Sequence, residues 1–72
     1  MLYLNKYMTD NKSKFLQIYA NLPLGAREEI VVVVDDEPLT WKAARLEILE
    51  DTEKGKKIIE ILSKLGILDK DI

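Results

Sequence analysis

The stretch EEIVVVVDDEPLTW, residues 28–41, decides the fold of this chain. It holds five successive β-branched residues, Ile30 to Val34, between two clusters of acids. Such side chains lose rotamer freedom in a helix and fit the pleated surface of a strand. Because residues 30–34 do not alternate apolar with polar, both faces of this strand are expected to need cover. A chain this short can cover one face with its own helices, so the other face must meet a flanking segment, a partner chain or water.

The acids that follow the strand predict a hairpin. Asp35 and Asp36 suit a two-residue turn, although the glycine that usually occupies the second position is missing. A return strand at about residues 37–40 would then pair with a first strand at about residues 29–34. Pro38 cannot donate a ladder hydrogen bond, so the return strand is expected at an edge. The less favoured alternative is that Asp36 caps a helix that has Pro38 in its first turn.

Periodic apolar residues predict three helices, at about residues 10–21, 41–50 and 52–65. Pro23 ends the first helix, because the residue before a proline is pushed out of the α region. Thr40 is well placed to cap the second helix, and Gly66 to end the third. The last two helices keep one heptad phase across their junction, so a single bent helix is the alternative. We favour a break at residues 50–53, where capping residues cluster.

These elements predict a single α+β domain, residues 1–72, in the order α-β-β-α-α, with the hairpin packed against the helices. A domain of this size buries only roughly 60% of the surface that its unfolded chain exposes, so we expect modest stability. Met8 could be a second translation start, which would make residues 1–7 an optional extension, and residues 1–8 are expected to be a flexible N-terminal segment. Residues 69–72 are expected to fray.

The absence of two residue types limits the kinds of catalytic and metal-binding site that the chain could form. The chain has neither cysteine nor histidine, which removes disulfides, thiolate ligands and the side chain most used for proton transfer near neutral pH. No charge-free apolar run approaches the roughly 20 residues that span a bilayer, and the start lacks the apolar core of a signal peptide. We therefore expect a cytoplasmic protein that is not an enzyme, with no cofactor, no membrane association and no small-molecule substrate.

Charge is distributed unevenly along the chain. Residues 28–53 carry nine acids against two basic residues, whereas residues 1–27 and 54–72 are both net basic. The basic ends could fold over the acidic middle, or the middle could steer a basic partner. The internal arrangement is favoured, because patches this small are common on solvated faces.

Three charged clusters could carry chemistry, but each has a simpler structural interpretation. The acids of residues 35–37 could hold a hard cation, yet they lack the spacing and glycine pivot of an EF-hand, so a solvated turn is favoured. The acids of residues 47–53 could form a carboxylate pair, but helix capping and surface charge explain them better. Residues 54–57 lack the Walker spacing of a phosphate-binding loop and predict the first turn of a helix.

A strand followed by two helices is also the order of elements in ribbon-helix-helix repressors. Those proteins read base edges with outward side chains of paired strands, which calls for polar residues along the strand. Residues 31–34 offer no hydrogen-bonding side chain, and the flanking acids repel a phosphate backbone. The similarity concerns element order alone, with no matching motif, so nucleic acid is not the favoured partner.

The sequence therefore favours a small non-catalytic protein-interaction or adaptor module. Self-association as a homodimer through residues 30–34 is expected, because the chain has few residues to cover the second face of this strand. The candidate interface consists of Ile30, Val31, Val32, Val33, Val34 and Trp41. For Trp41 the favoured alternative is a place in the core. The alternative functions are a small DNA-associated transcriptional regulator using the lysines at 54, 56, 57 and 64 and, more remotely, a metal-dependent carboxylate site.

Overall fold

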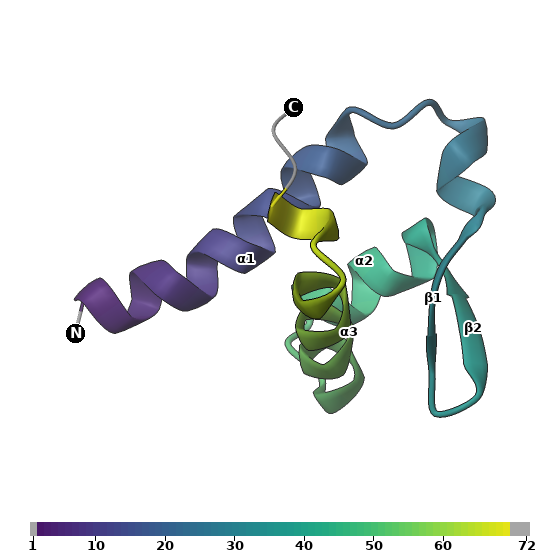
Figure 1. Cartoon of the computed structure of the whole chain (residues 1–72). Helices are drawn as coiled ribbons and strands as arrows, with labels where there is room; N and C mark the ends of the chain where they lie inside the picture. Colours follow the sequence, from purple (N-terminus) through teal and green to yellow (C-terminus); the bar gives the residue numbers. More distant parts are fainter. Residues whose placement is uncertain (1, 70–72) are drawn as a thin grey trace.

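The computed structural model describes the backbone of residues 2–69 and the side chains of residues 11–68. Its elements follow one another (Figure 1) as α1 (Leu2–Ala20), η1 (Gly25–Glu28), β1 (Ile30–Val34), β2 (Glu37–Thr40), α2 (Trp41–Leu49), α3 (Glu53–Lys64) and η2 (Ile67–Asp69). The α+β fold with the order α-β-β-α-α is confirmed. Two short 3-10 turns, η1 and η2, are added to the predicted elements. Of the segment 69–72, where fraying was predicted, only Asp69 is described.

Helix α1 is longer than the sequence analysis predicted. The expected start near residue 10 depended on a capping residue, but the backbone is already helical at Leu2. No proline or glycine lies between residues 2 and 20, so nothing in the sequence interrupts the helix there. The helix ends at Ala20, ahead of Pro23, as expected. The optional extension of residues 1–7 and the flexibility of residues 1–8 stay predictions.

The hairpin forms as predicted. Strands β1 and β2 are antiparallel and pair Val32 with Leu39, Val33 with Pro38, and Val34 with Glu37. Asp35 and Asp36 have φ angles of 51° and 67°. Positive φ at both central residues is the signature of a type I′ turn, which matches the twist of the strands it joins. The aspartates adopt this conformation without the usual glycine, and the alternative of a helix capped by Asp36 is wrong.

Burial alternates along most of β1. Val32 and Val34 are buried, with 6% and 2% of their surface exposed, whereas Val33 is 56% exposed. The pairing register shifts between Ile30 and Val32, so Val31 has no direct partner on β2. Such a bulge changes the direction of the strand and breaks the alternation. Ile30, before the bulge, is 55% exposed.

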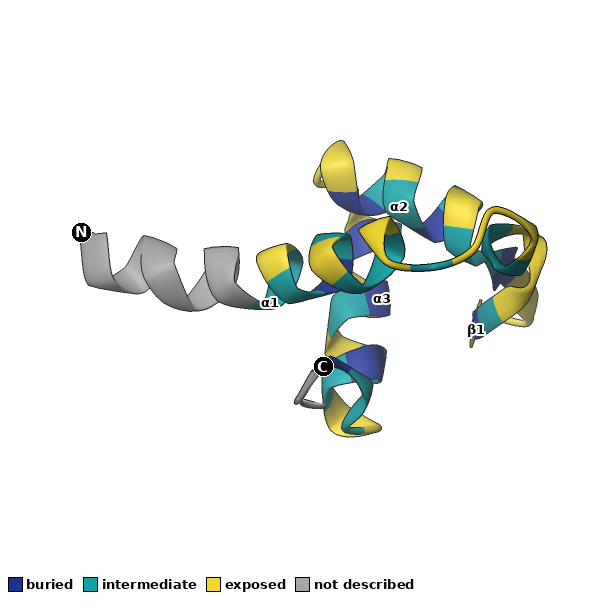
Figure 2. Ribbon diagram, turned by 90° about the horizontal axis from the view of Figure 1, so that it is seen from above, coloured by how far each residue is buried: buried dark blue, intermediate teal, exposed yellow. Residues whose placement is uncertain are grey.

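In the described part of the chain, the helices pack against one face of the hairpin. Helices α2 and α3 contact β1, α2 also contacts β2, and α1 packs against α2, α3 and η2 on the far side (Figure 1). Buried residues, dark blue in Figure 2, gather where these elements meet. This core consists of Phe15, Val32, Val34, Leu39, Ala44, Ile48, Ile58, Leu62 and Leu68. The hairpin thus contributes one face to the core and presents the other to solvent.

Helices α2 and α3 are separate, as the favoured prediction stated. Asp51 in the connecting turn has a φ of 55°. The hydroxyl of Thr52 accepts a hydrogen bond from the backbone N–H of Gly55 at 2.9 Å and so caps α3. Thr40 caps α2 in the same way, accepting from the N–H of Ala43 at 3.0 Å. Gly66 follows α3 with a φ of 80°, the left-handed conformation that commonly ends a helix.

Candidate interaction surface on the hairpin

The solvent-facing side of the hairpin carries a small apolar patch. We call this patch, made of Ile30, Val33 and Pro38, the hairpin outer face. Val33 lies opposite Pro38 in the register, and both are exposed. Among the described side chains, the other large apolar ones that are exposed are Leu24, Leu46, Leu49 and Leu65. Of these, none lies on a strand, so the outer face is the only apolar patch there that adjoins a sheet edge.

In the described part of the chain, no further strand pairs with the outer edge of β1. Within residues 2–69 the sheet has two strands, so each strand has a strand neighbour on one side only. Apart from the ladder between β1 and β2, no backbone hydrogen bond within the described part of the chain involves residues 30–34. Unpaired N–H and C=O groups along an exposed strand are a template for another strand.

The position of Pro38 shows in which direction the backbone N–H and C=O groups of Val33 point. Antiparallel strands alternate hydrogen-bonded with non-hydrogen-bonded pairs, and proline has no N–H to exchange. The pair formed by Val33 and Pro38 is therefore the non-hydrogen-bonded kind, and the N–H and C=O of Val33 face away from β2. The same proline leaves the outer edge of β2 without a central donor. Of the two edges, that of β1 is the better equipped to add a strand.

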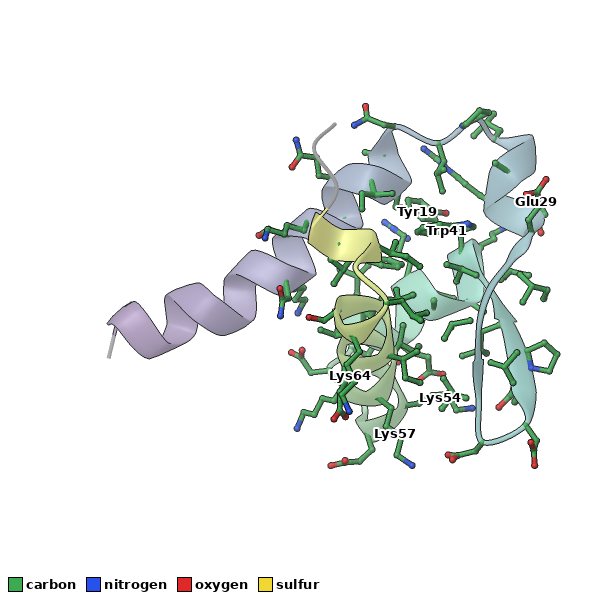
Figure 3. All side chains as sticks on the ribbon, viewed as in Figure 1. Tyr19, Glu29, Trp41, Lys54, Lys57 and Lys64 are labelled. Carbon is green, nitrogen blue, oxygen red and sulfur yellow. The ribbon has the colours of Figure 1, made fainter. Side chains whose placement is uncertain are left out.

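The hairpin is acidic, and bases from the helices neutralise part of its charge. Residues 28–40 include five acids and no base. Lys54 and Lys57 extend from α3 toward the turn (Figure 3), where their Nζ atoms lie 2.6 Å from Glu37 Oε1 and 3.1 Å from Asp35 Oδ2. The hydrogen bond with Glu37 raises the pKa of Lys54, against a smaller opposing effect of desolvation.

A basic residue also meets the acidic segment at each of two other places. Lys42 Nζ on α2 lies 3.6 Å from Glu28 Oε2, and Lys12 Nζ on α1 lies 3.1 Å from Asp51 Oδ1. Together with the pairs of Lys54 and Lys57, the contact of Lys12 joins the basic ends of the chain to its acidic middle. The favoured internal interpretation of the charge pattern agrees with these pairs.

Among the described side chains, two acids beside β1 have no basic side chain as an ion-pair partner. Glu29 precedes the strand and Asp36 lies in the turn after it, and both are exposed. Within the described part of the chain, neither carboxylate has a hydrogen bond or ion pair. An uncompensated negative charge therefore stands at each end of β1.

Trp41 lies apart from the hairpin outer face. Its ring is 5.6 Å from the ring of Phe15, which is fully buried, and it packs against the core. Its backbone N–H donates to the carbonyl of Glu29 at 3.1 Å. The side chain is partly buried beside Tyr19, as Figure 3 shows. Its position supports the core interpretation.

Of the six side chains predicted as an interface, the structure exposes two. Ile30 and Val33 face solvent, Val31 is partly buried against the core, and Val32 and Val34 are buried. The sequence analysis did not recognise the exposed leucines of α2, Leu46 and Leu49, although their helical spacing with Lys42 would have placed them on the solvent side.

Tyr19 is flanked by two arginines. The guanidinium carbons of Arg27 and Arg45 lie 4.5 Å and 5.2 Å from the centre of its ring. Arg27 also donates to the carbonyl of Ala20 at 3.4 Å. The contact of Arg27 ties the connector between α1 and β1 to the end of α1, and the contact of Arg45 ties α2 to α1.

The remaining charged clusters have structural roles. Glu47 accepts a hydrogen bond from the hydroxyl of Thr52, which orients the capping residue. Residues 54–57 form the first turn of α3, as predicted, and Gly55 serves close packing there. Among the described side chains no three acids converge as a metal site would require.

No helix in the described part of the chain combines the length and apolar character needed to cross a membrane.

Comparisons with protein-family models, curated proteins and solved structures gave no match.

Proposed function

We propose that this chain is a non-catalytic protein-interaction module that binds its partner through the hairpin outer face and the open edge of β1. The observation that carries the proposal is the exposure of Ile30 and Val33, 55% and 56%, on a strand whose outer-edge backbone groups have no hydrogen bond within the described residues. Exposed apolar side chains beside an open strand edge are the features used in β-strand addition. Backbone hydrogen bonds supply affinity in that mode, and alternate side chains supply specificity.

The size of the patch decides the mode of binding. Fully burying a valine or isoleucine contributes about 1.5–3 kcal/mol, so the exposed halves of Val33 and Ile30 offer about 1 kcal/mol each. Association costs about 4–15 kcal/mol in lost translational and rotational freedom. The free energy gained by burying these two side chains is therefore too small by itself to offset the cost of association. Backbone hydrogen bonds along β1, at about 0.5–1.5 kcal/mol each, must supplement it, and the complex is expected to be weak or transient.

Site-specific photo-crosslinking tests the proposal. The full chain carries benzoylphenylalanine at position 33, and the control carries it at position 56, an exposed site on α3. Crosslinks formed from position 33 and absent from position 56 support the outer face as a contact surface. If position 33 gives neither a partner nor a crosslinked second copy in extract of the source cells, the proposal is wrong.

Self-association through residues 30–34 is one form of this function. Sedimentation velocity across a wide concentration range measures it directly, with Val33→Thr as the variant that keeps the β-branched shape and adds a polar group. A dimer that weakens in this variant would identify a second copy as the occupant.

A second candidate is a small DNA-associated regulator. The observation that favours it is the arrangement of α2 and α3, two helices joined by a short turn, with lysines along α3. Lys54 and Lys57 are engaged with acids of the hairpin, which reduces the charge left for phosphates. A gel-shift assay on duplex DNA at low salt tests this candidate, and absence of retardation excludes it.

A further inference from the structure

We infer that the partner strand belongs to a different protein and has a short apolar centre with lysine or arginine at both ends. This inference rests on the proposed function and specifies its partner. It comes from the charges at the two ends of β1 and from their effect on a second copy of the chain.

Each end of β1 has one acid that forms an ion pair with a lysine and one acid that does not, among the described residues. At the first end Glu28 pairs with Lys42, and at the turn Asp35 pairs with Lys57, whereas the carboxylates of Glu29 and Asp36 have no ion pair among the described residues. Lys42 and Lys57 come from helices α2 and α3, on the covered side of the hairpin. A strand added at the open edge therefore meets acids at both ends and no base on the hairpin itself.

Even the paired acids remain accessible. The side chains of Glu28 and Asp35 are 65% and 73% exposed. Exposed ion pairs contribute little, so these carboxylates can exchange a lysine of their own chain for one of a partner. Each end of β1 thus offers one free carboxylate and one that is easily released.

A second copy of the chain is a poor occupant of this edge. If two β1 strands pair antiparallel, Glu28 and Glu29 of one copy face Asp35 and Asp36 of the other at both ends. If they pair parallel, each acidic cluster faces its equivalent. Like charges placed opposite each other across a strand pair are destabilising. Neither orientation avoids this repulsion, whereas basic flanks on a different protein turn it into attraction.

The strand also sets the length of the partner. Five residues of β1 span about 17 Å at roughly 3.3 Å per residue, so the apolar centre of the partner is about five residues long. Its side chains on the outer side lie next to Ile30 and Val33. A basic residue just outside this centre then reaches Glu29 at one end and Asp36 at the other.

Two nine-residue peptides test the inference against the full chain. Both have the centre Val-Thr-Val-Thr-Val, and one carries two lysines at each end where the other carries two glutamates. Affinity is measured by fluorescence anisotropy at low and high salt, and amide NMR shifts locate the site. We expect the lysine peptide to bind more tightly, to shift the amide of Val33 and to weaken as salt rises.

The double variant Glu29→Gln and Asp36→Asn should lower the affinity for the lysine peptide about fivefold, as expected for two exposed ion pairs. The matched control, Glu50→Gln with Glu53→Gln, removes the same charge from exposed positions off the hairpin and should leave the affinity nearly unchanged. Equal affinity for both peptides at residues 30–34 overturns the basic partner and keeps the interaction module.

Other outcomes separate the two proposals further. A concentration-dependent dimer that protects the amide of Val33 makes a second copy the occupant and overturns the inference of a basic partner. Absence of peptide binding, together with absence of crosslinks from position 33, removes the proposed function itself.

Discussion

The carbonyl oxygen of Glu47 lies so close to Gly55 that a β-carbon on residue 55 would overlap it. The contact joins α2 to the first turn of α3, and it exists because the two helices cross directly after a short turn. Glycine in the interior of a helix lowers the stability of the helix by about 1 kcal/mol relative to alanine. At this position the close approach of the two backbones outweighs that preference, which explains a glycine in a run of lysines.

Gly55→Ala should therefore destabilise the protein, although alanine is the better helix former. Forcing an extra carbon into a closely packed contact between backbones costs about 1–3 kcal/mol. Urea denaturation measures the change in the free energy of unfolding. Gly25→Ala is the matched control, because nothing lies within 4 Å of the added carbon; it should be neutral or slightly stabilising. A Gly55→Ala variant as stable as the parent would show that the helices can separate freely.

Asp36→Gly should stabilise the hairpin. Asp36 adopts a φ of 67° at the second position of a type I′ turn, where glycine is the preferred residue. Removing the strain of a left-handed residue gains about 1–2 kcal/mol, and the extra conformational freedom that glycine loses on folding offsets about 0.5–1 kcal/mol of this gain. Thermal denaturation followed by circular dichroism should show a higher Tm. Asp36→Ala, which keeps a β-carbon and loses the polar side chain, should instead lower the Tm.

The same substitution should destabilise the protein at Val34 and have almost no effect at the adjacent Val33. Val34→Thr places a hydroxyl in the core and should cost about 1–3 kcal/mol, because Val34 is only 2% exposed. Val33→Thr should change stability by less than about 0.5 kcal/mol, because Val33 is half exposed and threonine also favours strands. Chemical denaturation of both variants gives the comparison. Equal losses would mean that the outer face is covered in solution.

The ion pair between Lys54 and Glu37 should contribute stability that disappears in alkali. Its hydrogen bond raises the pKa of folded Lys54 above the ordinary value of 10.5. The contribution is therefore complete below pH 10.5 and is lost as the pH rises through the folded-state pKa. The parent should be more stable than Glu37→Gln at about pH 9, and this difference should shrink above the folded-state pKa.

The control for this pH dependence is Lys56→Met, which removes a lysine with no ion pair or hydrogen bond in the described part of the chain. Its stability is compared with that of the parent over the same pH range. A constant difference between the parent and Glu37→Gln would show that the pair does not form in solution.

Local sequence determined the elements of this protein. Five β-branched residues make β1, two aspartates between strands make the turn, and Thr40 and Thr52 mark the starts of α2 and α3. These features depend on rotamer freedom and on hydrogen bonds within a few residues, which a sequence displays directly. The start of α1 was the main error, because a helix without interrupting residues has no local signal for where it begins.

Only the tertiary structure decided which residues of the apolar segment 30–34 are buried and which are exposed. The sequence predicts an apolar strand, but not that Val32 and Val34 enter the core while Val33 and Ile30 stay in solvent. That division depends on which side α2 and α3 occupy and on a bulge at Val31, both of which are set by contacts between distant segments. The same packing brings the lysines of α3 to some acids of the hairpin, whereas Glu29 and Asp36 have no basic partner among the described side chains, because the described helices pack against one face of the hairpin.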